Sequence, residues 1–238
     1  MDTNRNYGRA VGVLYILGTV SGILSRVLTE PIRNVQDSLS GVSANENQII
    51  LGALFVLAMG LALAMVPVTA FPALRKHNQV LALGYVVFRG GLETVTYMAM
   101  AVSWLLLLPL SQVYQAGVSD ASNLRALGNS ILEAQEIGSI SGIVFCLGAL
   151  MFYYVLYRSK LIPRWLSGWG LIAIILNLAA VLLTVFGLVG ISSTASFVLQ
   201  FPTFVQELVM AVWLIVKGFN PSANASRAIA PGNQPKFA

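Results

Sequence analysis

The sequence predicts an all-α fold, a polytopic membrane helix bundle with six transmembrane helices. Two observations predict this class. First, 57% of the 238 residues are hydrophobic and only 10% are charged, with a mean hydropathy of +0.77, whereas soluble globular chains carry about 25% charged residues. Second, the apolar residues form runs long enough to cross a bilayer, which takes about 20 residues of helix. The composition therefore excludes a soluble domain.

Residues 1–218 are expected to form one transmembrane domain. We interpret the first apolar run as a retained span and not a signal peptide, because no Ala-x-Ala cleavage site follows it. Pro67 and Pro72 fall late in the second run and are expected to kink it or end it early. The predicted spans are residues 10–28, 49–74, 80–108, 136–157, 165–189 and 196–217.

Two segments outside the spans carry separate expectations. The longest connection, Pro109 to Gln135, either lies on the membrane surface or extends the fourth span. The tail, residues 219–238, is rich in Pro, Ser, Asn and Ala and is expected to be disordered and cytoplasmic.

The charges predict an orientation. With six spans, alternate loops share a side, and basic residues mark the cytoplasmic side. Both termini and the two short loops then lie in the cytoplasm. That side receives Arg5, Arg9, Arg75, Lys76, Arg158, Lys160, Arg164, Lys217, Arg227 and Lys236, whereas the other receives Arg33 and Arg125, with Arg26 near its border.

The third span contains a charged pair. Arg89 and Glu93 are four residues apart, so on a helix they share one face. A lone ionised group within hydrocarbon costs between about 3 and more than 10 kcal/mol. The pair is therefore expected to face the inside of the bundle, with the other helices arranged around it.

Polar residues on the last two spans are expected to lie at about the same depth in the membrane as Arg89 and Glu93. Glu207 lies near the middle of the sixth span, and Ser196, Gln200 and Thr203 precede it at helical spacing. Asn177 lies near the middle of the fifth span. We therefore predict one polar centre that comprises Arg89, Glu93, Glu207, Asn177, Gln200 and Thr203.

The charges of this centre leave two interpretations open. Arg89 stays ionised at any relevant pH, and one carboxyl can pair with it. The other carboxyl would be desolvated and would then favour its protonated form. Such a group suits a proton-coupled carrier or a general acid. Alternatively, Arg89 simply locks the third span to the sixth as a structural clamp. Asn177, Gln200 and Thr203 are more often interhelical hydrogen-bonding residues than ligands.

Several classes of function are disfavoured. The chain contains one histidine, His77, and one cysteine, Cys146, so we expect no metal site and no cofactor. The sequence lacks Gly-x-Ser-x-Gly, His-Glu-x-x-His and phosphate-binding motifs. Nucleic acid is not expected as a partner, because the basic residues stand at span ends.

Short motifs resemble a known family. They are Phe88-Arg89 followed by Glu93, Leu156-Tyr157-Arg158-Ser159 with Pro163-Arg164 and Gly168, and Pro202, Glu207 and Leu214-Ile215-Val216-Lys217-Gly218. From about Arg9 to Gly218 the chain resembles the bacterial domain-of-unknown-function family 4386. The resemblance implies a six-span membrane protein without an established activity, and it singles out Arg89, Glu93 and Glu207. Many members carry a histidine in the fourth span, whereas this chain has Cys146 and Gly148 there, which argues against a histidine-dependent role.

The sequence leaves three classes of function for a multi-pass protein of the bacterial inner (plasma) membrane. The first is a small carrier or lipid-handling protein that binds a lipophilic small molecule or a proton at the polar centre. The second is a membrane-embedded cyclase or isomerase that uses a carboxyl acid on a lipid-soluble substrate. The third is a structural or regulatory subunit. The lipid bilayer is the partner common to all three.

Overall fold

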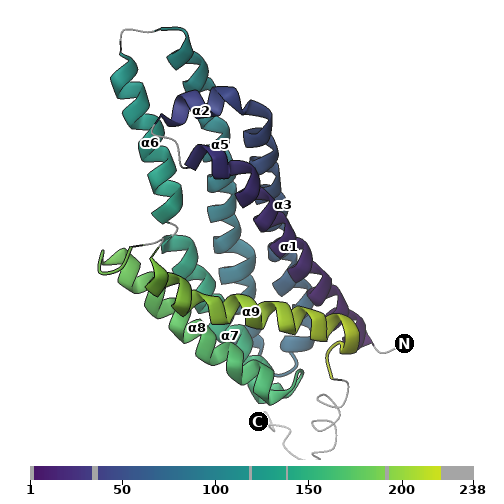
Figure 1. The fold of residues 1–238 in the computed structure, drawn as a ribbon. Coiled ribbons are helices and arrows are strands. Elements are labelled where there is room, and N and C mark those ends of the chain that lie inside the picture. The colour runs from purple at the N-terminus through teal and green to yellow at the C-terminus, as the bar shows by residue number, and fades with distance from the viewer. Residues whose placement is uncertain (1–2, 34–36, 118–119, 138, 191–192, 221–238) are drawn as a thin grey trace, which may run out of the picture.

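The computed structural model describes residues 3–33, 37–117, 120–137, 139–190 and 193–220. This part of the chain is helical and contains no strand (Figure 1). Residues 221–238, most of the expected tail, lie outside it. The helices are α1 (Thr3–Arg33), α2 (Ser38–Ala44), α3 (Glu46–Leu74), α4 (Gln79–Tyr85), the π-helical turn η1 (Val86–Leu92), α5 (Glu93–Gln115), α6 (Ala121–Ile137), α7 (Ser139–Ser159), α8 (Arg164–Val185) and α9 (Thr194–Lys217).

Six helices in the described residues are long and apolar enough to cross a membrane, which confirms the predicted fold class. The prolines at 67 and 72 do not end the second of them, because α3 continues to Leu74. The six are Thr3–Ile32, Glu46–Leu74, Gln79–Gln115, Ser141–Ser159, Arg164–Val185 and Thr194–Lys217.

The third of these helices is longer than the range 80–108. It joins α4, η1 and α5 and continues through Pro109 to Gln115. Helix α6 then runs back beside α5 and ends immediately before α7 (Figure 1). Much of the connection predicted at 109–135 is thus helix, which lengthens the third span and then leads back to the fourth.

The six helices close into a ring. Helix α1 packs on α3, α3 on η1 and α5, α4 and η1 on α7, α7 on α8, α8 on α9, and α9 back on α1. The first three spans and the last three make equivalent contacts. The two halves meet at two junctions. Span one (α1) packs on span six (α9), and span four (α7) packs on span three (α4 and η1). Spans three and six carry Arg89 and Glu207.

The closing contact between α1 and α9 depends on Gly12. A Cβ atom at this position would lie 2.6 Å from the carbonyl oxygen of Ala211 on α9. Only the absence of a side chain lets the two backbones approach this closely. Beyond α9, Phe219 is fully buried and the Asn220 amide donates to the Leu161 carbonyl. The first two residues of the predicted tail are therefore part of the fold.

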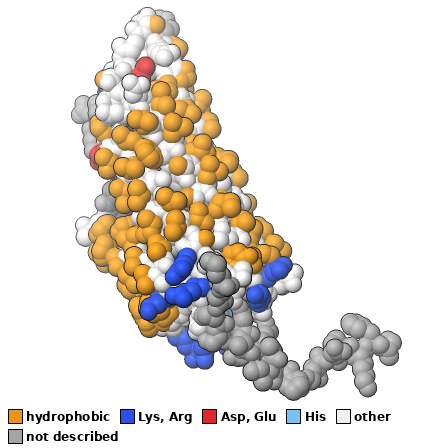
Figure 2. All heavy atoms as spheres, turned by 90° about the vertical axis from the view of Figure 1, so that its right-hand side faces the viewer, with side chains coloured by type: hydrophobic (Ala, Val, Ile, Leu, Met, Phe, Trp, Pro, Cys, Tyr) orange, Lys and Arg blue, Asp and Glu red, His pale blue; other side chains and the backbone are white. Residues whose placement is uncertain are grey.

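The surface divides into an apolar belt and a basic end. Figure 2 shows hydrophobic side chains over most of one face, with lysine and arginine gathered at one end of the molecule. Many large hydrophobic side chains on the six helices are exposed, as lipid-facing residues would be.

Candidate functional site

The π-helical turn η1 positions Arg89. The Glu93 amide donates to the carbonyl of Phe88, five residues earlier. In an α-helix it would donate to the carbonyl four residues earlier, so this segment is a π-helix. The sequence here contains the Gly90-Gly91 pair, and such glycines permit local changes of helix geometry. Helix α7 approaches the turn at Gly148, where a Cβ would lie 3.2 Å from the Phe88 Cβ and 3.3 Å from the Arg89 nitrogen. This contact holds the turn against α7.

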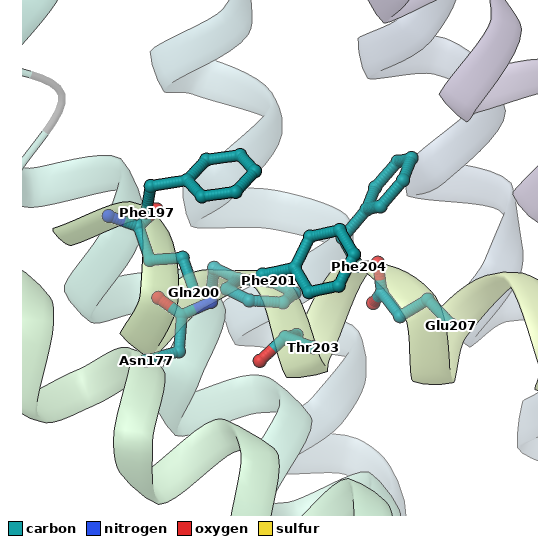
Figure 3. A pocket seen from close by; sticks show the side chains of 8 residues that line it. Asn177, Phe197, Gln200, Phe201, Thr203, Phe204 and Glu207 are labelled. Carbon is teal, nitrogen blue, oxygen red and sulfur yellow. The ribbon is translucent and has the colours of Figure 1, made fainter. Parts of the chain in front are cut away.

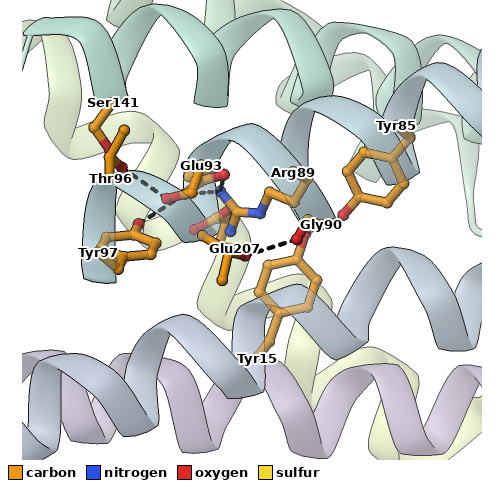
Figure 4. A network of polar contacts seen from close by, with 10 residues as sticks. Tyr15, Tyr85, Arg89, Gly90, Glu93, Thr96, Tyr97, Ser141 and Glu207 are labelled. Atoms are coloured by element: carbon orange, nitrogen blue, oxygen red, sulfur yellow. Dashed lines mark hydrogen bonds and ion pairs between the residues drawn. The ribbon is translucent and has the colours of Figure 1, made fainter. Parts of the chain in front are cut away.

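Arg89 and Glu93 form a buried, two-point ion pair. The Nη1 atom of Arg89 lies 3.0 Å and 3.1 Å from the two carboxylate oxygens of Glu93 (Figure 4). Their side chains are 3% and 1% exposed. Tyr97, one turn further along α5, donates its hydroxyl to Glu93 Oε1 at 2.7 Å. Glu93 is therefore paired, hydrogen-bonded and shielded.

Glu207 is held more loosely. Its Oε1 atom lies 3.6 Å from Nη2 of Arg89, and its side chain is 19% exposed. Among the described residues this oxygen has no hydrogen-bond partner although it is buried. The sequence analysis predicted that the three charges meet, and the structure brings them together. It also shows that the two carboxyls are not equivalent.

Aromatic side chains enclose the guanidinium. It lies over the Phe145 ring, 4.5 Å from its centroid, and 5.8 Å from that of Tyr15. The Tyr15 hydroxyl is 3.2 Å from that of Tyr85, and Tyr85 stacks on Phe152. Such contacts stabilise a buried cation in addition to its carboxylate partners.

Sequence reasoning missed Tyr15, Tyr85, Tyr97 and Tyr153. Tyr15 and Tyr153 stand in apolar runs without a polar stripe that marks them. Tyr85 and Tyr97 stand four residues before Arg89 and four after Glu93, a helical spacing that could have placed them on the same face. Tyr153 sits beside Tyr154 and Tyr157 in the sequence, a cluster typical of a membrane interface. The structure buries Tyr153, which donates to Gln206, while the Gln206 amide donates to the Leu166 carbonyl at 3.0 Å.

A pocket of about 410 Å³ lies beside Glu207, between α7, α8 and α9. In Figure 3, the three phenylalanines of α9 stand along one side of the helix, with Glu207 at the end of their row. Those three rings are between 46% and 64% exposed, so the pocket opens at the surface of the bundle. Its lining residues are Phe145, Asn177, Phe197, Gln200, Phe201, Thr203, Phe204 and Glu207.

The pocket accounts for the remaining predicted site residues. Asn177 and Gln200 line it, together with Thr203 and Glu207. Thr203 also donates to the Ala173 carbonyl at 3.0 Å, so it joins α9 to α8. Arg89 and Glu93 are not part of the lining. The six predicted residues therefore form two adjoining groups, which Glu207 and Phe145 connect.

Comparison with known proteins identifies the family. A family model described as a domain of unknown function (DUF4386) matches residues 10–218. The chain belongs to this family. The matched region of this DUF4386 protein contains all six membrane-length helices except the first turns of α1. No curated protein and no solved structure matches the chain.

The two groups of this DUF4386 protein differ in their chemistry. The Arg89–Glu93 pair is buried and its two charges are matched within one helix, and Arg89 meets the sixth span through its 3.6 Å contact with Glu207. Glu207 presents a carboxyl to an apolar, aromatic pocket. The arrangement can therefore hold an apolar body among the rings and a polar group at Glu207.

Proposed function

We propose that this membrane protein is a small carrier or lipid-handling protein that binds an amphipathic, lipid-soluble molecule in the pocket beside Glu207. The observation that carries this proposal is that four phenylalanine rings and the Glu207 carboxyl line the same pocket. Pockets for small molecules are mostly apolar, with a few polar groups that orient the ligand. Asn177 and Gln200 supply further hydrogen-bonding groups.

The opening of the pocket supports access from the bilayer. Phe197, Phe201 and Phe204 belong to the exposed apolar surface of a membrane-length helix. A lipid-soluble ligand can therefore enter sideways without crossing water. Arg89 links the third span to α9 through its 3.6 Å contact with Glu207, beside the pocket.

The same carboxyl supports a second candidate, a cyclase or isomerase acting on a lipid-soluble substrate. A carboxylic acid at the end of an apolar pocket can protonate an alkene or an enol ether. The two candidates differ in outcome, because a carrier releases its ligand unchanged. Mass spectrometry of the ligand recovered after incubation with the protein separates them.

We also propose that the protein lies in the bacterial inner (plasma) membrane with both termini in the cytoplasm. The basic residues gather at one end of the bundle (Figure 2), and the positive-inside rule assigns that end to the cytoplasm.

The proposal is tested with a hydrophobic carbodiimide, dicyclohexylcarbodiimide, which reacts with protonated carboxyls in apolar surroundings. Labelling in native membranes across pH should modify Glu207 and leave Glu93 unmodified, because only Glu207 lines the pocket. The neutral, lipophilic fluorophore N-phenyl-1-naphthylamine should protect Glu207. Glu207→Gln should abolish the labelling, and Glu30→Gln, on the polar surface, should not change it. Equal labelling of Glu93, or no labelling at any pH at which the protein stays folded, would contradict the proposal.

A further inference from the structure

The charge of the pocket is set by Glu207. Arg89 is the nearest cation, but it does not line the pocket, and the Phe145 ring lies against its guanidinium. The Nη1 atom of Arg89 lies 3.0 Å and 3.1 Å from the two carboxylate oxygens of Glu93, whereas its Nη2 atom lies 3.6 Å from Glu207 Oε1. A ligand in the pocket therefore meets a carboxyl and not a guanidinium.

The charge balance of the buried centre is incomplete. Two carboxyls share one guanidinium, so the fully ionised centre carries one surplus negative charge. Low-dielectric surroundings make an unmatched charge costly. The surplus is removed either by a proton on Glu207 or by a second cation beside it.

Aromatic faces in the pocket favour the second cation. The face of an aromatic ring carries partial negative charge and attracts cations within about 6 Å. Four of the eight lining residues are phenylalanines. An aromatic lining with a carboxylate is the arrangement that recognises organic ammonium groups, whereas an anion would be repelled by Glu207.

We propose that the pocket binds a lipid-soluble organic cation whose positive charge pairs with the Glu207 carboxylate in exchange for a proton. This inference rests on the proposed function and names the class of ligand. The cation enters from the bilayer, the O–H bond of Glu207 breaks, and the proton leaves to water. The net charge of the centre is the same before and after the exchange.

No other group near Glu207 changes this balance at neutral pH. Glu93 is held by Arg89 and Tyr97, and the tyrosines and the cysteine are ordinarily neutral at pH 7. The lining residue on α8 is the uncharged Asn177. The charged or titratable groups that act on Glu207 are Arg89 on η1, Glu93 and Tyr97 on α5, Tyr15 on α1, Tyr85 on α4, and Cys146 and Tyr153 on α7.

Two probes of the same shape and opposite charge test the inference. Tetraphenylphosphonium and tetraphenylborate are titrated into the purified full chain in a neutral detergent, with N-phenyl-1-naphthylamine as the neutral reference. We expect the cation to bind at least about tenfold more tightly than the anion. In a weakly buffered solution each bound cation should release about one proton.

Two variants separate charge from packing. Glu207→Gln should remove the preference for the cation and the proton release while the neutral probe still binds. Phe204→Leu keeps an apolar side chain but removes the ring face, so it should weaken cation binding by roughly three- to tenfold and weaken binding of the neutral probe by a smaller factor. Phe186→Ala, at an exposed ring outside the pocket, is the matched control.

The outcomes distinguish the two proposals. Equal binding of cation and anion, or cation binding without proton release, would overturn the cation exchange and leave a pocket for lipid-soluble molecules. Failure of all three probes to bind would overturn the proposed function as well.

Discussion

Glu207 Oε1 on α9 lies 3.6 Å from Arg89 Nη2 on η1. The third span and the sixth span therefore contact each other through these two side chains inside the ring of helices. Arg89 makes its shorter contacts with Glu93, and Glu207 lines the aromatic pocket. One guanidinium therefore connects a buried ion pair to a carboxyl that lines the pocket.

Removal of Arg89 should destabilise the fold strongly. Arg89→Ala leaves Glu93 buried without a countercharge, and breaking a buried pair in this way costs about 3–5 kcal/mol. The free energy of unfolding in mild detergent measures the effect.

The matched control is Arg26→Ala. Arg26 pairs with Glu30 at 3.2 Å on the surface, with side chains 57% and 48% exposed, so its loss should cost no more than about 0.5–1 kcal/mol. Similar small effects of both substitutions would show that Arg89 is not a clamp. The double variant Arg89→Met/Glu93→Leu should be more stable than Arg89→Ala, because the fully buried Glu93 is removed together with its countercharge.

The Tyr97 hydroxyl should stabilise the ionised Glu93. Tyr97→Phe removes the 2.7 Å hydrogen bond to Glu93 Oε1, and hydrogen bonds to charged groups contribute about 1.5–3 kcal/mol. The same unfolding measurement should show a loss of this size. Tyr154→Phe alters a 47% exposed ring in the same way and should be neutral. An unchanged stability for Tyr97→Phe would mean that Glu93 does not need this donor.

The close approach of α7 to η1 should require glycine at position 148. Gly148→Val places atoms against the Phe88 Cβ and the Arg89 backbone, which cannot move aside easily, so overpacking should cost about 1–3 kcal/mol. The displaced turn should also weaken binding of N-phenyl-1-naphthylamine to the pocket.

Gly91→Ala is the matched control for this substitution. A Cβ at Gly91 meets nothing within 4 Å, and alanine favours helix over glycine by about 1 kcal/mol. This variant should be neutral or more stable. Equal damage from Gly91→Ala and Gly148→Val would point to the π-helical turn itself and not to the contact with α7.

The attachment of α2 to α5 should weaken in acid. Asp37 accepts hydrogen bonds from the Ser40 hydroxyl at 2.8 Å and the Tyr114 hydroxyl at 2.9 Å. Burial acts to raise the pKa of Asp37, but the hydrogen bonds from Ser40 and Tyr114 outweigh it and hold this pKa below its ordinary value of 3.8. Because the folded pKa is the lower one, the stabilisation is complete above the unfolded pKa and is lost as the pH falls through the folded value.

Amide hydrogen exchange across residues 38–44 measures this effect. After correction for the intrinsic exchange rate, protection of α2 should be constant from neutral pH to about pH 5 and fall below about pH 4. Asp37→Asn should lower protection by about 1 kcal/mol, because the Ser40 and Tyr114 hydroxyls lose a charged acceptor, and should remove the pH dependence. Protection that falls equally with pH in this variant would assign the acid sensitivity to another group.

The orientation should be visible in single-cysteine labelling. In a Cys146→Ser background, Lys76→Cys stands at the basic end and Asn123→Cys stands on α6. A membrane-impermeant maleimide added to intact cells should label Asn123→Cys alone if, as we propose, the basic end faces the cytoplasm. Labelling of Lys76→Cys from outside would reverse the assignment.

The sequence determined the helix bundle, the six spans and the meeting of three charged residues. Apolar runs of membrane length have few folded alternatives, because backbone groups in lipid must be satisfied within a helix. An isolated charge in hydrocarbon is costly, so Arg89 is expected to pair with Glu93 and Glu207 inside the helix bundle.

The tertiary structure alone decided how the two carboxyls differ and where the pocket lies. The contact between the Tyr15 and Tyr85 hydroxyls joins residues 70 positions apart in the chain, so no local pattern predicts it. The hydrogen bond from Tyr97 to Glu93 differs, because the two residues are four apart on one helix. The π-helical turn at η1 packs against Gly148 of α7, which is 60 residues away in the chain from Phe88. Helical periodicity places a side chain on a face of its own helix, but only the packing of the neighbouring helices determines which atoms stand opposite that face.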